Sequence, residues 1–318
     1  MKNKNIFFTL LIILLVASCT PSSLHTIQAT STVSVLTQTD ELPLSLQSLR
    51  NSTYSGIYEE PITLMDGIYE IKSSSENDST RTIVEYMDGS EIFGDINGDG
   101  EDDAVVFLVE RGGGSGAFVY VSVQLNQNGQ PLDAGAVRIE DRVGVQASAI
   151  ENNQVVLDII TQGPGDVACC STHKARNIYE LQEGKLVETF TQTENLVRIS
   201  IDDLNGTTWT LVEIDMEIPL ETDTPINIKF QDSQLSGNSG CNSYEANFTL
   251  NTDNPLIMDI SSISSTRKKC PDPVGSQEIA FISALDEVSH WGYHYGKLAL
   301  FYKGDGKELS RLLFISND

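Results

Sequence analysis

The chain has 318 residues, a formal net charge of −25 at pH 7 and 40% hydrophobic residues. A protein this acidic repels nucleic acid and anionic lipid headgroups, so the composition excludes a nucleic-acid-binding role. The apolar fraction is sufficient for packed cores, and the length favours about two domains.

The N-terminus has the pattern of a secretory signal. Lys2 and Lys4 precede an apolar run over residues 6–16, which is shorter than the roughly 20 residues needed to cross a bilayer. The following Val16-Ala17-Ser18-Cys19 resembles a lipobox, in which small residues precede a cysteine that becomes the lipidated N-terminus. We therefore predict a signal peptide at 1–18 and lipidation of Cys19. The protein would then be extracytoplasmic and anchored by lipid to a bacterial membrane, facing the periplasm or on the cell surface.

Residues 19–42 are predicted to be a tether. Ten of the twenty residues from Thr20 to Thr39 are Ser or Thr, and none is aromatic. Such a segment cannot bury enough apolar surface to offset its ordering entropy.

The region 43–195 is predicted to be a mostly β domain, because its periodic segments are short and rich in β-branched and aromatic residues. The pattern predicts one short helical turn, at residues 44–50. The strand-like segments are Phe118–Leu125, Val155–Ile160 and a hairpin of Ile178–Leu181 and Lys185–Glu188 around Glu183-Gly184.

The region 199–318 is predicted to be an α+β domain. One helix is expected from Gln277 to about Ser289, because Ile279, Ile282, Leu285 and Val288 recur every three residues. A closing hairpin is expected around the tight turn 303–307. The expected strands are Trp209–Val212, Ile226–Phe230, Ala246–Leu250, Leu298–Tyr302 and Leu309–Ile315.

The acidic segment 95–103 is the clearest candidate metal site. Asp95, Asn97, Asp99 and Asp103 occupy positions 1, 3, 5 and 9 of a loop, with Gly100 at position 6. This spacing can wrap oxygen ligands around Ca²⁺, although position 12 is a valine and the flanking segments look like strands. The alternative is a polar hairpin turn that holds no metal. If Ca²⁺ binds, its role would be to brace the turn.

Four cysteines remain after Cys19: Cys169, Cys170, Cys241 and Cys270. An even number in an oxidising compartment permits disulfides, but the spacing does not give their pairing. Cys169 and Cys170 precede His173, which suggests a thiol nucleophile or a soft metal site. A vicinal disulfide or two buried thiols are the structural alternatives, and no Asp or Asn stands at an obvious position to orient His173.

Three motifs in the C-terminal region occur in a characteristic order. They are Leu204-Asn-Gly-Thr-Thr-Trp209, Gly240-Cys-Asn-Ser-Tyr244 and Ser264-Ser-Thr-Arg-Lys-Lys-Cys270. This series resembles the META/HslJ family over about the last 115 residues, and it departs from the family at Lys268-Lys269 and at Ala246-Asn247. The region 43–195, with its Asp-x-Asn-x-Asp-Gly loop, resembles an uncharacterised domain of other bacterial lipoproteins.

The META/HslJ resemblance implies a curved antiparallel sheet or partial barrel with one packed helix. It also implies that Cys241 and Cys270 form a disulfide, that Asn242 and Tyr244 are structural, and that the protein acts in the cell envelope or stress response. Family members are not known as enzymes.

The sequence contains no recognisable constellation of catalytic residues. There is no phosphate-binding glycine loop, no zinc-protease motif and no Gly-x-Ser-x-Gly elbow. We therefore expect a non-catalytic lipoprotein with a binding or scaffold role, whose ligand is a protein, peptide or lipid. The alternatives are a calcium-braced structural or adhesion module and an enzyme that uses Cys169 or Cys170 with His173.

Overall fold

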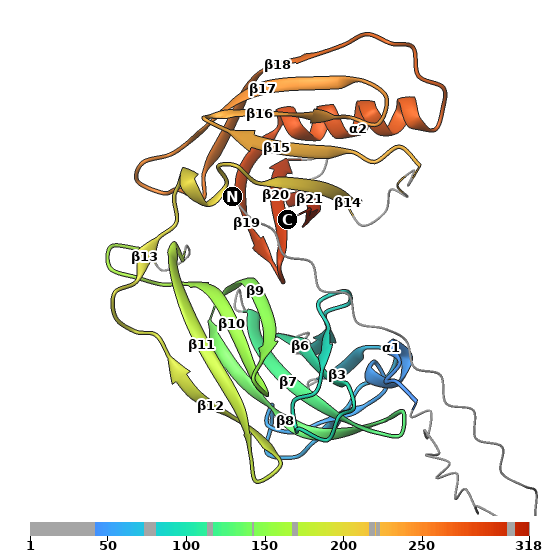
Figure 1. Ribbon diagram of the computed structural model, residues 1–318, viewed down its shortest axis with the longest axis vertical. Helices are drawn as coiled ribbons and strands as arrows, with labels where there is room; N and C mark the ends of the chain where they lie inside the picture. Colours follow the sequence, from blue (N-terminus) through green and yellow to red (C-terminus); the bar gives the residue numbers. More distant parts are fainter. Residues whose placement is uncertain are drawn as a thin grey trace, which may run out of the picture. The chain divides into compact units, whose positions relative to one another are not determined.

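The computed structural model describes residues 42–72, 81–112, 117–141, 143–166, 171–215, 220, 223–303 and 309–317. They lie within one compact unit, Glu41–Asp318. The described part of the chain contains no helix that is long and apolar enough to cross a membrane. The predicted fold class, mainly β with one packed helix in the C-terminal region, is confirmed (Figure 1).

The first sheet has six strands in the order β3-β4-β6-β7-β8, with β5 paired to β6, and all its pairings are antiparallel. Val105 and Phe107 of β6 belong to one core, whereas Val106 and Leu108 belong to another. Successive side chains of a strand point to opposite faces, so this sheet is covered on both sides. Its strands are β3 (Ile68–Lys72), β4 (Arg81–Tyr86), β5 (Ile92–Gly94), β6 (Asp103–Arg111), β7 (Ala117–Gln127) and β8 (Gln130–Asp141).

A five-stranded sheet covers one of these faces. Its order is β12-β11-β10-β9, with β13 paired to β11. Leu157 and Tyr179 share a core with Val105 and Phe107, which makes the two sheets a sandwich. The hairpin predicted at Glu183-Gly184 is confirmed by positive φ angles of 52° and 77°. The strands are β9 (Gly144–Glu151), β10 (Gln154–Thr161), β11 (His173–Gln182), β12 (Lys185–Thr191) and β13 (Val197–Arg198).

The other face of the six-stranded sheet packs against the first residues that the structure describes. The short helix α1 (Leu46–Leu49) matches the predicted turn and has Ser45 as its N-cap. Leu49 and Tyr54 pack in the same core as Val106 and Leu108. A two-stranded sheet, β1 (Thr53–Tyr54) and β2 (Ile62–Thr63), completes this layer.

The C-terminal region forms an eight-stranded antiparallel sheet in the order β18-β17-β16-β15-β14-β21-β20-β19. Figure 1 shows this sheet curling into a half-barrel, with α2 beside it. A short 3₁₀ helix, η1 (Ile201–Asp203), precedes the sheet. The strands are β14 (Thr208–Ile214), β15 (Asn227–Gln231), β16 (Gln234–Asn238), β17 (Ser243–Leu250), β18 (Met258–Ser265), β19 (Val288–His294), β20 (Lys297–Lys303) and β21 (Leu309–Ser316).

The two ends of this sheet approach each other at one point. Ile257, just before β18, forms an isolated antiparallel bridge with His290 of β19. Trp291 reinforces this seam, because its backbone N–H donates to Leu256 O and its indole N–H donates to Pro255 O. The half-barrel is therefore nearly closed around the core to which the fully buried Trp291 belongs.

The helix α2 (Val274–Asp286) begins three residues before the predicted helix and ends before Ser289. Its buried residues are Gln277, Phe281, Ala284 and Leu285, a stripe at i, i+4, i+7 and i+8. Ile279 was expected in this stripe, but it lies on the opposite side of the helix and is 72% exposed. Val288, which completed the predicted spacing, is instead the first residue of β19. Pairing with β20 is the tertiary interaction that ends the helix early.

Candidate functional site

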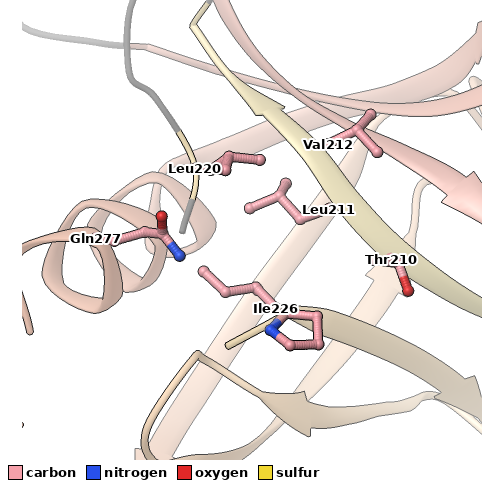
Figure 2. A pocket seen from close by; sticks show the side chains of 7 residues that line it. Thr210, Leu211, Val212, Leu220, Ile226 and Gln277 are labelled. Carbon is pink, nitrogen blue, oxygen red and sulfur yellow. The ribbon is translucent and has the colours of Figure 1, made fainter. Parts of the chain in front are cut away.

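A cavity of about 250 Å³ opens in the C-terminal region where β14 and the chain leading into β15 face the first turn of α2. Figure 2 shows the side chains of Leu211, Leu220 and Ile226 gathered around it, with the amide of Gln277 on the helix side. Its lining residues are mostly apolar, namely Thr210, Leu211, Val212, Leu220, Pro225, Ile226 and Gln277.

Backbone pairing fixes the floor of the cavity. The N–H of Leu211 donates to Ile226 O at 2.9 Å, which places these two apolar residues on adjacent segments. Both side chains are buried. A β-bulge between Leu211 and Glu213 interrupts the pairing of β14 with β21, and Val212 at this bulge is 39% exposed at the cavity. Bulges re-aim side chains in this way.

Asn242, in the Gly-Cys-Asn-Ser-Tyr motif, joins three segments below α2. Its backbone N–H and its side-chain amide N–H donate to the two carboxylate oxygens of Glu278 at 3.0 and 2.8 Å. Its side-chain oxygen accepts hydrogen bonds from Thr266 Oγ1 and from the backbone N–H of Lys268. Ser239 Oγ also donates to Glu278. Buried polar groups are stable only when paired in this way, which gives Asn242 the structural role implied by the resemblance.

Cys241 and Cys270 are joined at this network by a disulfide, with Cα atoms 6.1 Å apart. Their sulfurs and a Glu278 carboxylate oxygen lie within 4.8 Å of one another. Sulfurs that are bonded to each other are not thiolates, and thiolates are the form of cysteine that binds metals. The group therefore braces the fold and is not a metal centre in the oxidised protein.

Tyr244 ends the same motif and is also structural. Its hydroxyl donates to Asn227 O at 3.0 Å, and its ring packs edge-on against Phe281 at 5.4 Å between centroids. Burial raises the pKa of this phenol well above its usual value. Tyr244 thus stays neutral and connects β17 to α2.

The acidic loop lies between β5 and β6, which are strands as predicted. Asp95 Oδ1 accepts the backbone N–H groups of Gly98 and Asp99, and its Oδ2 accepts that of Gly100. Asn97 and Asp99 also accept backbone N–H groups of this loop. These side chains therefore satisfy the backbone of a tight turn.

Asp103 is fully buried and connects the loop to two strands. Its carboxylate accepts hydrogen bonds from the backbone N–H groups of Ile96 and Asn97 and, at 2.8 Å, from that of Asn126 in β7. Burial raises the pKa of Asp103, although these hydrogen bonds oppose the shift.

The loop provides the oxygen atoms that Ca²⁺ prefers, but this arrangement directs them at backbone N–H groups. Among the described residues, the carboxylates of Asp95, Asp99 and Asp103 do not converge to within 4.8 Å as a group of three ligands. The observed hydrogen bonds form a self-supporting turn, and Ca²⁺ binding by this loop stays a prediction. No step in the function proposed below depends on a metal.

A turn that supports itself without an ion should give the same melting temperature in excess Ca²⁺ and in EDTA. A site with a Kd of about 10⁻³ M would stabilise the fold by roughly 1.4 kcal/mol at tenfold excess ligand, which a melt readily detects. Calorimetric melts under the two conditions measure this difference. A melting temperature that rises with Ca²⁺ and saturates would show that the loop rearranges around the ion, in favour of the calcium-braced module.

Asp166 orients His173, which the sequence analysis did not predict. Asp166 Oδ2 lies 3.1 Å from His173 Nδ1. The same carboxylate accepts the backbone N–H groups of Gly163 and Thr172 and the hydroxyl of Thr172. Burial alone would raise the pKa of Asp166, but these hydrogen bonds together lower it. A carboxylate on Nδ1 fixes the orientation of an imidazole, so our expectation that nothing orients His173 was wrong.

Gly163 has a steric role beside this pair. A Cβ atom at this position would lie 2.2 Å from His173 ring atoms, so only glycine allows the loop to pass over the imidazole. Cys169 and Cys170 lie outside the described residues, as does the predicted lipidation site Cys19. Their predicted roles stay predictions.

Sequence patterns did not predict the cavity or Asp166. Leu211 and Ile226 are ordinary strand residues in the sequence, and Leu220 has no regular pattern around it. The proximity of Asp166 to His173 in the sequence was the one signal that could have been used.

The C-terminal region is a half-barrel sheet with one packed helix. A disulfide braces it, and it contains a mostly apolar cavity. Residues 202–313 match the family model of the META domain, which confirms the resemblance in the C-terminal motifs. An NMR structure of a protein from Burkholderia xenovorans aligns with 41% of this chain and 99% of its own, at 20% identity and a TM-score of 0.29. No curated protein matches the chain.

Proposed function

We propose that this protein is a membrane-anchored extracytoplasmic lipoprotein whose META domain binds an apolar group, in a non-catalytic role in the cell envelope or stress response. The cavity between β14 and α2 is the observation that carries the proposal. The META match supports a stress-related lipoprotein context for the C-terminal region.

The size and lining of the cavity favour an apolar ligand. An engineered cavity of about 150 Å³ lined by apolar side chains binds benzene, so about 250 Å³ can take a short acyl segment or an aromatic ring. Burying such a group stabilises a complex by about 25 cal/mol per Å² of apolar surface removed from water. Gln277 and Thr210 supply polar groups that can orient the ligand.

The described lining residues do not supply a catalytic group. None of the seven that the structure describes around the cavity is a His, Cys, Lys or acidic residue, and hence none of these seven is an ordinary general acid, general base or activated nucleophile. Binding without chemistry is therefore the function that this site supports best.

Filling the cavity is expected to abolish binding of an apolar probe. Leu220 is half-buried and is not part of a strand, so Leu220→Trp would occupy the space with little strain on the sheet. We expect the fluorescent probe N-phenylnaphthylamine to bind the unmodified protein and to bind this variant at least about tenfold more weakly, a loss of about 1.4 kcal/mol. Titration of the probe measures the difference.

Ile279→Trp is the matched control, because Ile279 lies on the exposed side of α2 and does not line the cavity. It should bind the probe as the unmodified protein does. Equal binding by all three proteins, or an equal loss in both variants, would contradict the assignment of the site.

Membrane attachment is expected to depend on Cys19. The short apolar run and the lipobox-like Val16-Ala17-Ser18-Cys19 motivate this part of the proposal. In a bacterial host, Cys19→Ser should move the protein from the membrane fraction to the soluble fraction, because stable anchoring requires covalent acyl chains. Immunoblotting of the two fractions measures this. Membrane retention of Cys19→Ser would mean that another feature anchors the chain.

A further inference from the structure

A second cavity, independent of the META domain, lies at one end of the β-sandwich. It is a groove of about 560 Å³ where the acidic loop, the β9–β10 turn and the β11–β12 turn come together. Loops at the end of a rigid sandwich are common positions for binding residues. The groove is lined by Ile96, Asn97, Leu125, Asn152, Asn153, Gln154, Glu180, Leu181 and Gly184.

The lining combines an apolar base with a polar rim. Ile96 is buried and Leu125 and Leu181 are half-buried, so they offer a limited apolar surface. Four amide side chains and the carboxylate of Glu180 make up the rim. None of the nine lining residues that the structure describes is a lysine or an arginine, so these residues offer no side-chain cation to an anionic ligand.

Part of the rim is fixed in place and part is free to bind. Asn153 Nδ2 donates to Asp95 O at 3.0 Å, and Gln154 Nε2 donates to Glu180 Oε1 at 2.5 Å. The exposed side chain of Asn152 makes no hydrogen bond with the described residues. Asn152 has a positive φ of 53° in the turn, where glycine would be less strained but would provide no amide.

We propose that this groove binds a neutral oligosaccharide. A sugar ring has hydroxyl groups along its edge and C–H groups on its faces, which match the amide rim and the apolar base. Each primary amide offers two donors and a two-lone-pair acceptor, and a hydroxyl can satisfy either kind. A wholly apolar ligand would cover the rim amides without replacing their hydrogen bonds to water, which is costly.

Charge limits the ligand further. The chain carries −25 overall, and Glu180 and the neighbouring acidic loop add local negative charge. Anionic sugars and phosphorylated ligands are therefore repelled. No aromatic ring is found among the described residues that line the groove, so the binding energy would come from hydrogen bonds and modest apolar contact, and the affinity should be weak.

Isothermal titration of the full-length chain with chitohexaose, maltohexaose and cellohexaose tests the proposal. We expect at least one of them to bind, and Asn152→Ala to weaken that binding about tenfold, as expected for loss of a paired amide worth about 1.4 kcal/mol. Asn247→Ala is the matched control, because Asn247 is an exposed asparagine on β17, away from the groove. It should leave the affinity unchanged.

Two results would overturn the proposal. One is that none of the three oligosaccharides binds, and the other is that Asn152→Ala and Asn247→Ala have equal effects. Hexalysine serves as a further probe, and if it alone bound in an Asn152-dependent manner, the groove would be a site for basic peptides. Binding of N-phenylnaphthylamine should be unaffected by Asn152→Ala, which keeps this test separate from that of the META cavity.

Discussion

Replacing Asp103 with alanine is expected to lower the free energy of unfolding by about 3 to 5 kcal/mol, because two buried backbone N–H groups and a third that is partly buried would lose their acceptor. The donors are those of Ile96, Asn97 and Asn126. Asp103→Asn keeps one acceptor oxygen and should cost less. Urea unfolding measures both variants.

Asp102→Ala provides the matched control, because Asp102 is the exposed neighbour in the same loop. It should change stability by less than about 0.5 kcal/mol. If Asp103→Ala were as stable as Asp102→Ala, the loop could not depend on this carboxylate.

The free energy of unfolding should also change with pH in the range where Asp103 titrates. Burial raises its pKa above the usual value of about 4, so the folded state holds this proton more tightly than the unfolded state. The stability that this tighter proton binding adds is fully present at pH values below the unfolded pKa, and it is lost as the pH rises through the raised folded pKa. Asp103→Asn should remove this part of the pH dependence.

Breaking the disulfide is the second large effect. The double variant Cys241→Ser, Cys270→Ser should lose about 3 to 4 kcal/mol, since the bond closes a loop with a sequence separation of 29. The melting temperature should fall by roughly 10 °C. Circular dichroism melts with and without a reductant measure this.

The reductant provides an internal control. It should lower the melting temperature of the unmodified protein toward that of the double variant, and it should leave the double variant unchanged. If the double variant had the same melting temperature as the unmodified protein, the hydrogen bonds around Asn242 would be sufficient to stabilise this part of the fold without the disulfide.

Local patterns predicted much of the fold. The Glu183-Gly184 hairpin and the strand at Phe118–Leu125 follow from turn chemistry and alternation, both of which act over a few residues. The end of the helix was predicted less well, because Val288 fits the helical spacing in the sequence. In the structure Val288 pairs with Tyr302 of β20 and is the first residue of a strand. Propensity and spacing contain no information about that long-range partner.

The candidate site was largely beyond sequence reasoning, for the same reason. The cavity brings Leu211 and Leu220 together with Gln277, which lies far along the chain from both, and no local pattern predicts that contact. In the acidic loop, whose spacing predicts metal ligands, the fold uses Asp95 and Asp103 to satisfy backbone N–H groups. Carboxylate oxygens can do this and ligate a cation at once, so the Ca²⁺ site stays a prediction.

The most direct test of the proposed function is a crystal structure of the protein grown with N-phenylnaphthylamine. We predict density for the probe between Leu211, Leu220 and Ile226, with Gln277 at its edge and the half-barrel unchanged. A probe that occupied another surface, or a cavity that remained closed to it at saturating concentration, would contradict a binding role for this part of the META domain.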